Sequence, residues 1–145
     1  MSESFEEVLK KQGTLVFTPK GNSMQPLLSH NENPVVLVPV TGRLQKGDVP
    51  FYKRENGQYV LHRIIRVRKE SYDCCGDNQS AIEKGVTDQM IIAKMAGFYR
   101  GETYVSLNEA WVKRYAKRRM ATRPFRRFFA LVFLCFERLF QKSKR

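Results

Sequence analysis

Short runs rich in β-forming residues, separated by turn-forming residues, make up most of residues 14–98. The runs lie at 15–18, 35–40, 49–52, 59–67, 71–74 and 90–99. Between them come clusters of Gly, Pro, Asn and Asp, which favour turns. Many short strands with little helix between them are typical of a barrel or a strongly curled sheet. The pattern therefore predicts a mainly β, barrel-type body.

The start of the chain predicts a short helix. Residues 2–12 place acids early and lysines late, and Ser2 is available as the N-terminal cap. The first thirteen residues hold no apolar core of the signal-peptide kind. Three cysteines, of which Cys74 and Cys75 are adjacent, do not make a disulfide framework. These features predict a cytoplasmic location, and the Cys and His content predicts neither a metal site nor another cofactor.

The end of the chain has a helical period. Asn108 is positioned to cap a helix, and Pro124 predicts a break, with a second helix over 125–140. We therefore expect a body at 1–100 and a basic amphipathic helical tail at 101–145. The apolar stripe of the second helix consists of Phe125, Phe128, Phe129, Val132, Phe136, Leu139 and Phe140.

The net charge of +12 is concentrated in this tail. Residues 1–100 carry 14 basic against 11 acidic side chains (+3), whereas residues 101–145 carry 12 against 3 (+9). A basic segment with a large apolar stripe and few polar base-reading side chains suits lipid or protein better than nucleic acid. Three interpretations stay open for 120–145: contact with an anionic membrane surface, which would place the protein peripherally on the inner face; packing on the body; or a homodimer interface. The longest uncharged apolar run, 128–136, is too short to span a bilayer.

Ser23 is the candidate nucleophile. It lies in the segment 20–26, KGNSMQP, directly after the first predicted strand. Gly21 permits a sharp backbone turn and Pro26 stiffens its exit. A serine on such a bend can have free backbone N–H groups beside it, which an oxyanion hole requires. A Gly-Asn-Ser segment is also typical of an ordinary turn, so the assignment of Ser23 as nucleophile depends on a base and the other sequence blocks being present.

His62 is the candidate general base. In the predicted strand 59–67, Val60, His62 and Ile64 alternate onto one face. A histidine held neutral on an apolar face can accept a serine proton, although such a histidine can also be a hydrogen-bonded core residue. The other histidine, His30, lies in a polar turn and is expected to be solvated.

A carboxylate that orients His62 would complete the group. Asp77, in Gly76-Asp77-Asn78, is the first choice, and Glu83 and Asp88 compete for the same role. The alternative for Asp77 is an Asx-turn.

Four sequence blocks, in this order, resemble the signal-peptidase I and LexA-type serine peptidase clan. They are Gly21-x-Ser23-Met24-x-Pro26, Gly47-Asp48-Val49, Val60-Leu61-His62-Arg63-Ile64 and Gly76-Asp77-Asn78. Most bacterial members use a lysine as base, so a histidine at position 62 is similar to the endoplasmic-reticulum and archaeal-type branch. The resemblance covers about residues 14 to 97.

The resemblance implies a serine endopeptidase in which Ser23, His62 and Asp77 are catalytic and the substrate is a protein or a leader-type peptide. In that clan the peptide is bound as an added strand, with small side chains in shallow pockets near the cleaved bond; Met24 would border such a pocket or pack in the core. Pro50 predicts that its strand lies at a sheet edge. The alternative is a non-catalytic LexA-like peptide-binding module whose basic tail contacts nucleic acid or membrane.

Overall fold

The computed structural model describes residues 3–142. Strands account for 29% and helices for 31% of these residues. The elements, in chain order, are α1 (Phe5–Gln12), β1 (Leu15–Phe17), β2 (Val35–Val38), β3 (Pro50–Lys53), β4 (Tyr59–Leu61), β5 (Arg63–Val67), β6 (Tyr72–Cys75), β7 (Glu83–Val86), the 3-10 turn η1 (Asp88–Met90), β8 (Ile91–Arg100), β9 (Thr103–Ser106) and α2 (Ala110–Lys142).

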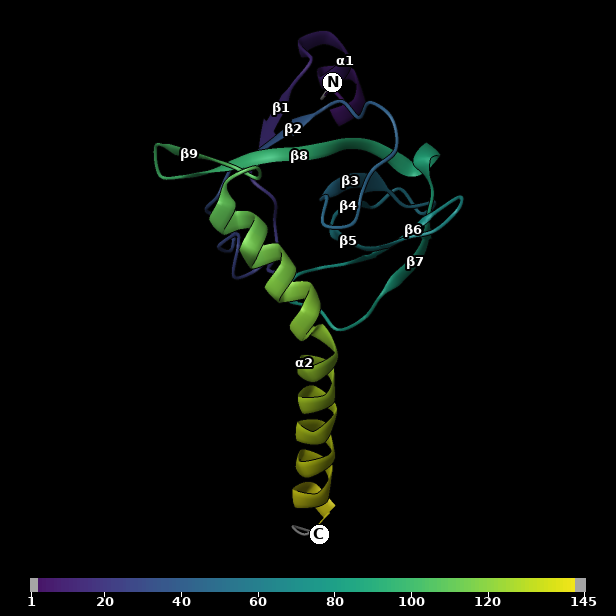
Figure 1. Cartoon of the computed structure of the whole chain (residues 1–145), viewed down its shortest axis with the longest axis vertical. Helices are drawn as coiled ribbons and strands as arrows, with labels where there is room; N and C mark the ends of the chain where they lie inside the picture. The colour runs from purple at the N-terminus through teal and green to yellow at the C-terminus, as the bar shows by residue number, and fades with distance from the viewer. Residues whose placement is uncertain (1–2, 143–145) are drawn as a thin grey trace.

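The larger sheet has six antiparallel strands and curls into a half-barrel (Figure 1). Its order is β1-β2-β8-β3-β4, and β9 pairs with the C-terminal part of β8. The predicted body is therefore confirmed at the level of a mainly β fold. The sheet also extends through β9, beyond the expected boundary at residue 100.

Pro50 is the first residue of β3, which lies between β8 and β4. The edge position predicted for this strand is therefore wrong. A proline is tolerated as the first residue of an inner strand, because its missing N–H then falls at the end of the ladder. The main strand path of the larger sheet ends at β1 and β4, and β9 lies off this path with β8 as its partner.

The smaller sheet has the order β5-β6-β7. The predicted strand 59–67 is split at His62, because β4 belongs to the larger sheet and β5 to the smaller one. Residues 60–64 are all buried, so the predicted alternation of faces is lost at this junction. His62 consequently sits where the chain passes from one sheet to the other.

Helix α1 begins one turn later than the sequence suggested. Ser4 caps it, its hydroxyl accepts a hydrogen bond from the Glu7 amide, and the Glu7 carboxylate accepts one from the Ser4 amide. Ser2, the predicted cap, lies outside the described residues. The helix packs through Phe5 and Leu9 on the core of the larger sheet.

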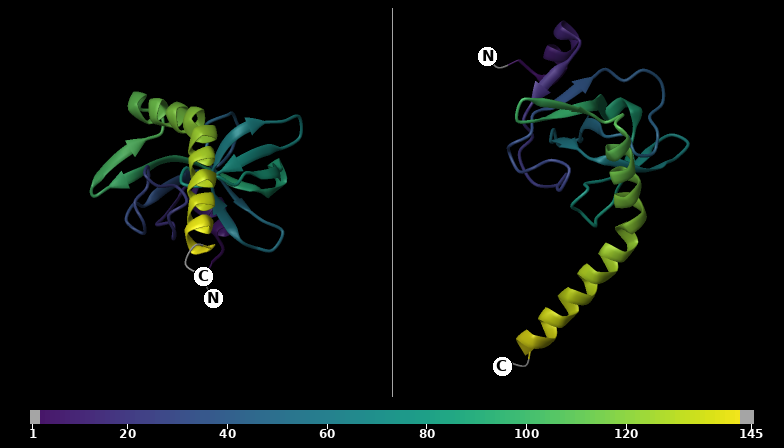
Figure 2. Two further views of the ribbon diagram at one scale, coloured as in Figure 1. Left: turned by 90° about the horizontal axis from the view of Figure 1, so that it is seen from below. Right: turned by 60° about the vertical axis from the view of Figure 1, so that its left-hand side comes forward.

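Helix α2 is a single helix with Pro124 inside it, so the predicted separation into two helices is wrong. Pro124 has no N–H to donate, and the helix bends in this region (Figure 2). Near its start, Val112 and Ala116 are buried against the body. Within residues 3–142, no helix is long and apolar enough to cross a membrane.

Candidate active site

Ser23 lies on the long turn that connects β1 to β2 and is half-buried. Met24, Leu27 and Leu28 are buried in the core and fasten this turn to the sheet. Met24 also lines the cleft in front of Ser23, so it has both of the roles considered for it. These buried side chains hold the turn in place, while Ser23 lines the cleft.

The backbone around Ser23 is suited to stabilising an oxyanion. Gly21 has a φ of 100°, a left-handed conformation that a residue with a side chain rarely adopts. In the described part of the chain, no hydrogen bond uses the amide of Ser23 or of Met24. Two unused amides beside a nucleophile are what a developing negative charge on a carbonyl oxygen requires.

Ser23 and His62 line the same cleft, which has a volume of about 640 Å³. Its walls come from the end of β1 and from β4, the two outermost strands of the larger sheet. One part of the cleft is aromatic and carries Phe5, Phe17, Phe51 and Tyr59, and Lys20 and Arg54 add positive charge. The cleft thus brings together the two residues that the sequence selected.

His62 is 7% exposed, and its burial lowers the pKa of the imidazole below the ordinary value of 6.5. Its Nδ1 lies 3.4 Å from Oη of Tyr52. The single phenolic hydrogen of Tyr52 is donated to Oε2 of Glu83 at 2.5 Å, so towards His62 the phenol can only accept. We infer that Nδ1 carries the imidazole proton, which leaves Nε2 as the basic nitrogen.

Glu83 is therefore linked to His62 through Tyr52. Arg54 binds the Glu83 carboxylate with two hydrogen bonds of 2.7 and 2.8 Å, and this pairing lowers the pKa of that carboxyl. Burial raises the pKa of Tyr52 far above its usual range, so the phenol stays protonated. Glu83 is also the strongest charge that favours protonated His62. Of the three carboxylates considered for this role, Glu83 is the one with a hydrogen-bonded partner, Tyr52, that also contacts His62.

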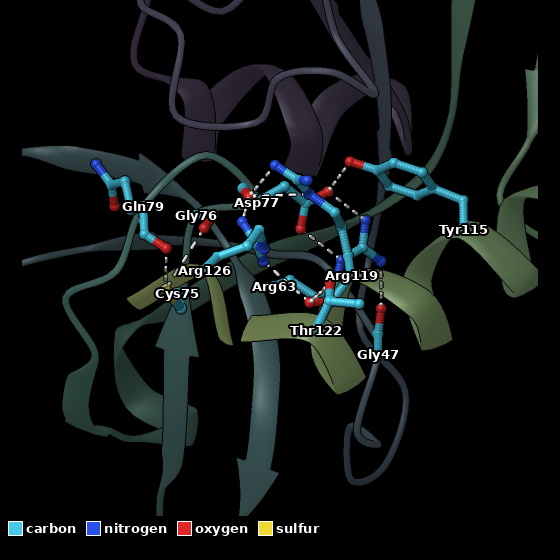
Figure 3. A network of polar contacts seen from close by, with 10 residues as sticks. All are labelled: Gly47, Arg63, Cys75, Gly76, Asp77, Gln79, Tyr115, Arg119, Thr122 and Arg126. Atoms are coloured by element: carbon cyan, nitrogen blue, oxygen red, sulfur yellow. Dashed lines mark hydrogen bonds and ion pairs between the residues drawn. The ribbon is translucent and has the colours of Figure 1, made fainter. Parts of the chain in front are cut away.

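Asp77, the first choice for the orienting acid, bonds to partners other than His62. Its Oδ1 and Oδ2 accept hydrogen bonds of 2.8 and 2.9 Å from Arg63, and Oδ2 accepts another from Tyr115 at 2.9 Å (Figure 3). Within residues 3–142, Asp77 makes no hydrogen bond with His62. Asp88 binds Tyr72 and Arg43 instead. Asp77 is thus an anchor for neighbouring segments, because Arg63 already satisfies its charge.

The loop that carries Asp77 still reaches Ser23, through its backbone. The Asn78 amide donates a 2.8 Å hydrogen bond to the Ser23 carbonyl. A Cβ added to Gly76 would lie 2.6 Å from the same carbonyl oxygen. Only glycine therefore allows the two segments to approach this closely.

Replacing Gly76 by alanine is expected to lower kcat/KM for peptide cleavage by about a hundredfold, because the Ser23 backbone must move by a substantial fraction of an ångström. Gly97→Ala is the matched control, since a Cβ there would lie 2.4 Å from the Val105 carbonyl, outside the cleft. This control should lose stability while its folded fraction keeps its activity. Equal activity losses in the two folded variants would contradict a specific link to Ser23.

Replacing Glu83 by glutamine is expected to move the acidic limb of the pH profile of kcat/KM to lower pH. The reason is that the Glu83 carboxylate raises the pKa of His62, whereas Arg54, left without its partner, lowers it. The exposed Glu55→Gln variant should leave the limb in place. A limb that stays, or that moves to higher pH, would show that Glu83 does not act on His62.

Several residues of this site were not selected from the sequence, namely Tyr52, Arg54, Arg63 and Tyr115. Arg63 carried a usable signal, because an arginine inside an apolar strand requires a buried acid as partner.

A comparison with known protein families and with curated proteins finds no match to this chain. His30 is exposed, as expected, and bonds to Asn31. No group of side chains suited to hold a metal ion occurs among residues 3–142.

Proposed function

We propose that this chain is a serine endopeptidase in which Ser23 is the nucleophile and His62 is the general base. One observation carries the proposal: a half-buried serine with unused amides shares a cleft with a buried histidine. The proton inferred on Nδ1 of this histidine would leave its Nε2 free to act as the base. Ser23 and His62 would have the roles of the serine and the histidine in a serine peptidase triad. The third role goes to Glu83, acting through Tyr52.

We further propose that the fold is of the signal-peptidase and LexA-like kind. The four sequence blocks that suggested it are far apart in the chain but bonded to one another. Gly47 donates to the Ile64 carbonyl, Ile64 donates to the Asp48 carbonyl, and Asn78 donates to the Ser23 carbonyl, each at 2.8 Å. Two of the blocks, those of Ser23 and His62, line the cleft, and the other two are bonded to them. Such an assembly supports a common role better than four independent turns do.

In the proposed mechanism, Oγ of Ser23 attacks the carbonyl carbon of a peptide bond while Nε2 of His62 takes the hydroxyl proton. The amides of Ser23 and Met24 stabilise the negative charge on the carbonyl oxygen. Protonated His62 then gives its proton to the leaving amine, which breaks the C–N bond and leaves an ester on Ser23. Water, deprotonated by His62, hydrolyses the ester and restores the serine.

The cleft favours an extended peptide as substrate. Because β1 and β4 border the cleft and are the outermost strands of their sheet, their backbone groups can hydrogen-bond to a peptide that lies between them. The aromatic cluster suits an apolar side chain of the substrate. Lys20 adds positive charge to the cleft, whereas the charge of Arg54 is already paired with Glu83.

Covalent labelling tests the proposal. We expect a fluorophosphonate to modify the folded protein at Ser23, as located by peptide mass spectrometry, and to leave the Ser23→Ala variant unmodified. Ser71→Ala is the control, since Ser71 lies in the β5–β6 connection and not in the cleft. Modification at another serine, or none in a folded protein, would reject the peptidase and favour a peptide-binding module.

A further inference from the structure

Beyond Arg126, α2 projects away from the body, and no other element among residues 3–142 lies beside it (Figure 1 and the right-hand view of Figure 2). Its large apolar side chains between 125 and 140 are mostly in contact with solvent. Those with exposed fractions of 50 to 70% are Phe125, Phe128, Phe129, Leu131, Phe133, Leu134, Phe136, Leu139 and Phe140. Contiguous apolar exposure on this scale is typical of a surface that meets a partner.

The direction of this half-helix is set by contacts with the body. Arg119 and Arg126 each donate a 2.9 Å hydrogen bond to the Asp77 carbonyl (Figure 3), and Arg123 donates one to the Ser80 carbonyl. These arginines clamp α2 to the loop 77–80, on both sides of Pro124. The packing of the apolar half on the body, one of the expected alternatives, is therefore not what the structure shows.

The positive charge of α2 favours an anionic membrane surface over a second copy of the chain as the partner of this apolar surface. Between Ala110 and Lys142 the sequence has ten Lys and Arg and one acid, Glu137, a net charge of +9. The apolar half itself, residues 125–140, holds three Arg and one acid, a net charge of +2. A second copy alongside would therefore bring like charge against like charge, which is repulsive. An anionic lipid surface is complementary, and each basic side chain near such a surface contributes about 1 kcal/mol of attraction.

The shape of the apolar face points the same way. A partner helix covers a narrow seam in which Leu, Ile and Val dominate. Here six of the sixteen residues at 125–140 are Phe, and Leu131, Phe133 and Leu134 extend the apolar surface well beyond one seam. A bilayer surface covers a broad face and accommodates aromatic side chains. Sixteen helical residues measure about 24 Å, less than the thickness of the hydrocarbon core.

We propose that the part of α2 from Phe125 onward is an interfacial helix that lies on an anionic bilayer, with its phenylalanines among the acyl chains and its exposed arginines, Arg127 and Arg138, at the headgroups. The helix then holds the body and its cleft at the membrane surface. This inference does not depend on whether Ser23 is a nucleophile.

Vesicle flotation of the full chain tests it. We expect the protein to float with phosphatidylcholine vesicles that contain about a third phosphatidylglycerol, and to float at least about tenfold less with phosphatidylcholine alone. Binding to the anionic vesicles should weaken as salt is raised. The triple variant Phe128→Gln/Phe129→Gln/Phe136→Gln should lose binding but keep its thermal unfolding, since these side chains are exposed.

The control is Val16→Gln/Tyr104→Gln, which removes exposed apolar side chains from the body and should float like the wild type. Three results would overturn the proposal: no flotation of the wild type, equal flotation on neutral and anionic vesicles, or equal loss in the control. A stable dimer in sedimentation that the triple variant abolishes would also overturn it, in favour of a second copy as the occupant.

Discussion

Peptide cleavage is expected to fall by at least about ten-thousand-fold when Ser23 is replaced by alanine, because the covalent route is then closed. His62→Gln should cause a loss of similar size, since glutamine cannot take the serine proton. The matched control is His30→Gln, which alters an exposed histidine outside the cleft and should leave kcat/KM unchanged. Activity within tenfold of wild type in either cleft variant, measured with a fluorogenic peptide, would contradict the proposed roles.

Replacing Asp77 by asparagine is expected to lower the free energy of unfolding by about 3–5 kcal/mol. The side chains of Asp77 and Arg63 are each 3% exposed, so the change leaves a buried guanidinium without its counter-charge. The same carboxylate accepts the Tyr115 hydroxyl, which joins the start of α2 to the loop. Urea denaturation followed by far-ultraviolet circular dichroism measures the change.

Asp73→Asn is the control for this experiment. Asp73 is also buried, but its partner Arg68 has a side chain that is 43% exposed and can be solvated after the change. A clearly smaller loss of stability is expected there. Equal losses in the two variants would show that the buried Arg63–Asp77 pair contributes no more to the free energy of unfolding than the partly exposed Arg68–Asp73 pair.

Much of the strand content could be predicted from the sequence because β1, β2, β3, β6 and β8 are runs rich in β-forming residues and bounded by turn residues. Two strands were missed. Strand β7 has the sequence Glu-Lys-Gly-Val, so its extended form depends on pairing with β6 and not on an apolar pattern. Strand β9 is a four-residue return that pairs with the end of β8.

The course of the chain at His62 could not be predicted. Residues 60–64 form an apolar run that is consistent with one continuous strand, and the change of sheet depends on pairing partners far away in the sequence. The same holds for the carboxylates. The turn that carries Asp77 follows a predicted strand, where a carboxylate can orient a histidine. The hydrogen bonds from Arg63 to Asp77 are evident only when β5 and the loop 76–80 are placed together.

The continuity of α2 through Pro124 shows the limits of a local rule. A proline removes one backbone hydrogen bond, and tertiary contacts can compensate for that loss. Here the arginines on both sides of it bond to carbonyls of the loop 77–80 and hold the helix in place. The sequence did identify the apolar stripe and the positive charge of this segment correctly, since both are local properties.

The most direct test of the central claim, that Ser23 and His62 act as one catalytic pair, is a double-variant cycle on kcat/KM for peptide cleavage. Ser23→Ala, His62→Gln and the combined variant would be compared with the wild type. If the two side chains work as a unit, removing the second after the first causes no further loss. We predict that kcat/KM of the combined variant equals that of the less active single variant. A combined loss equal to the product of the two single losses would contradict the pairing.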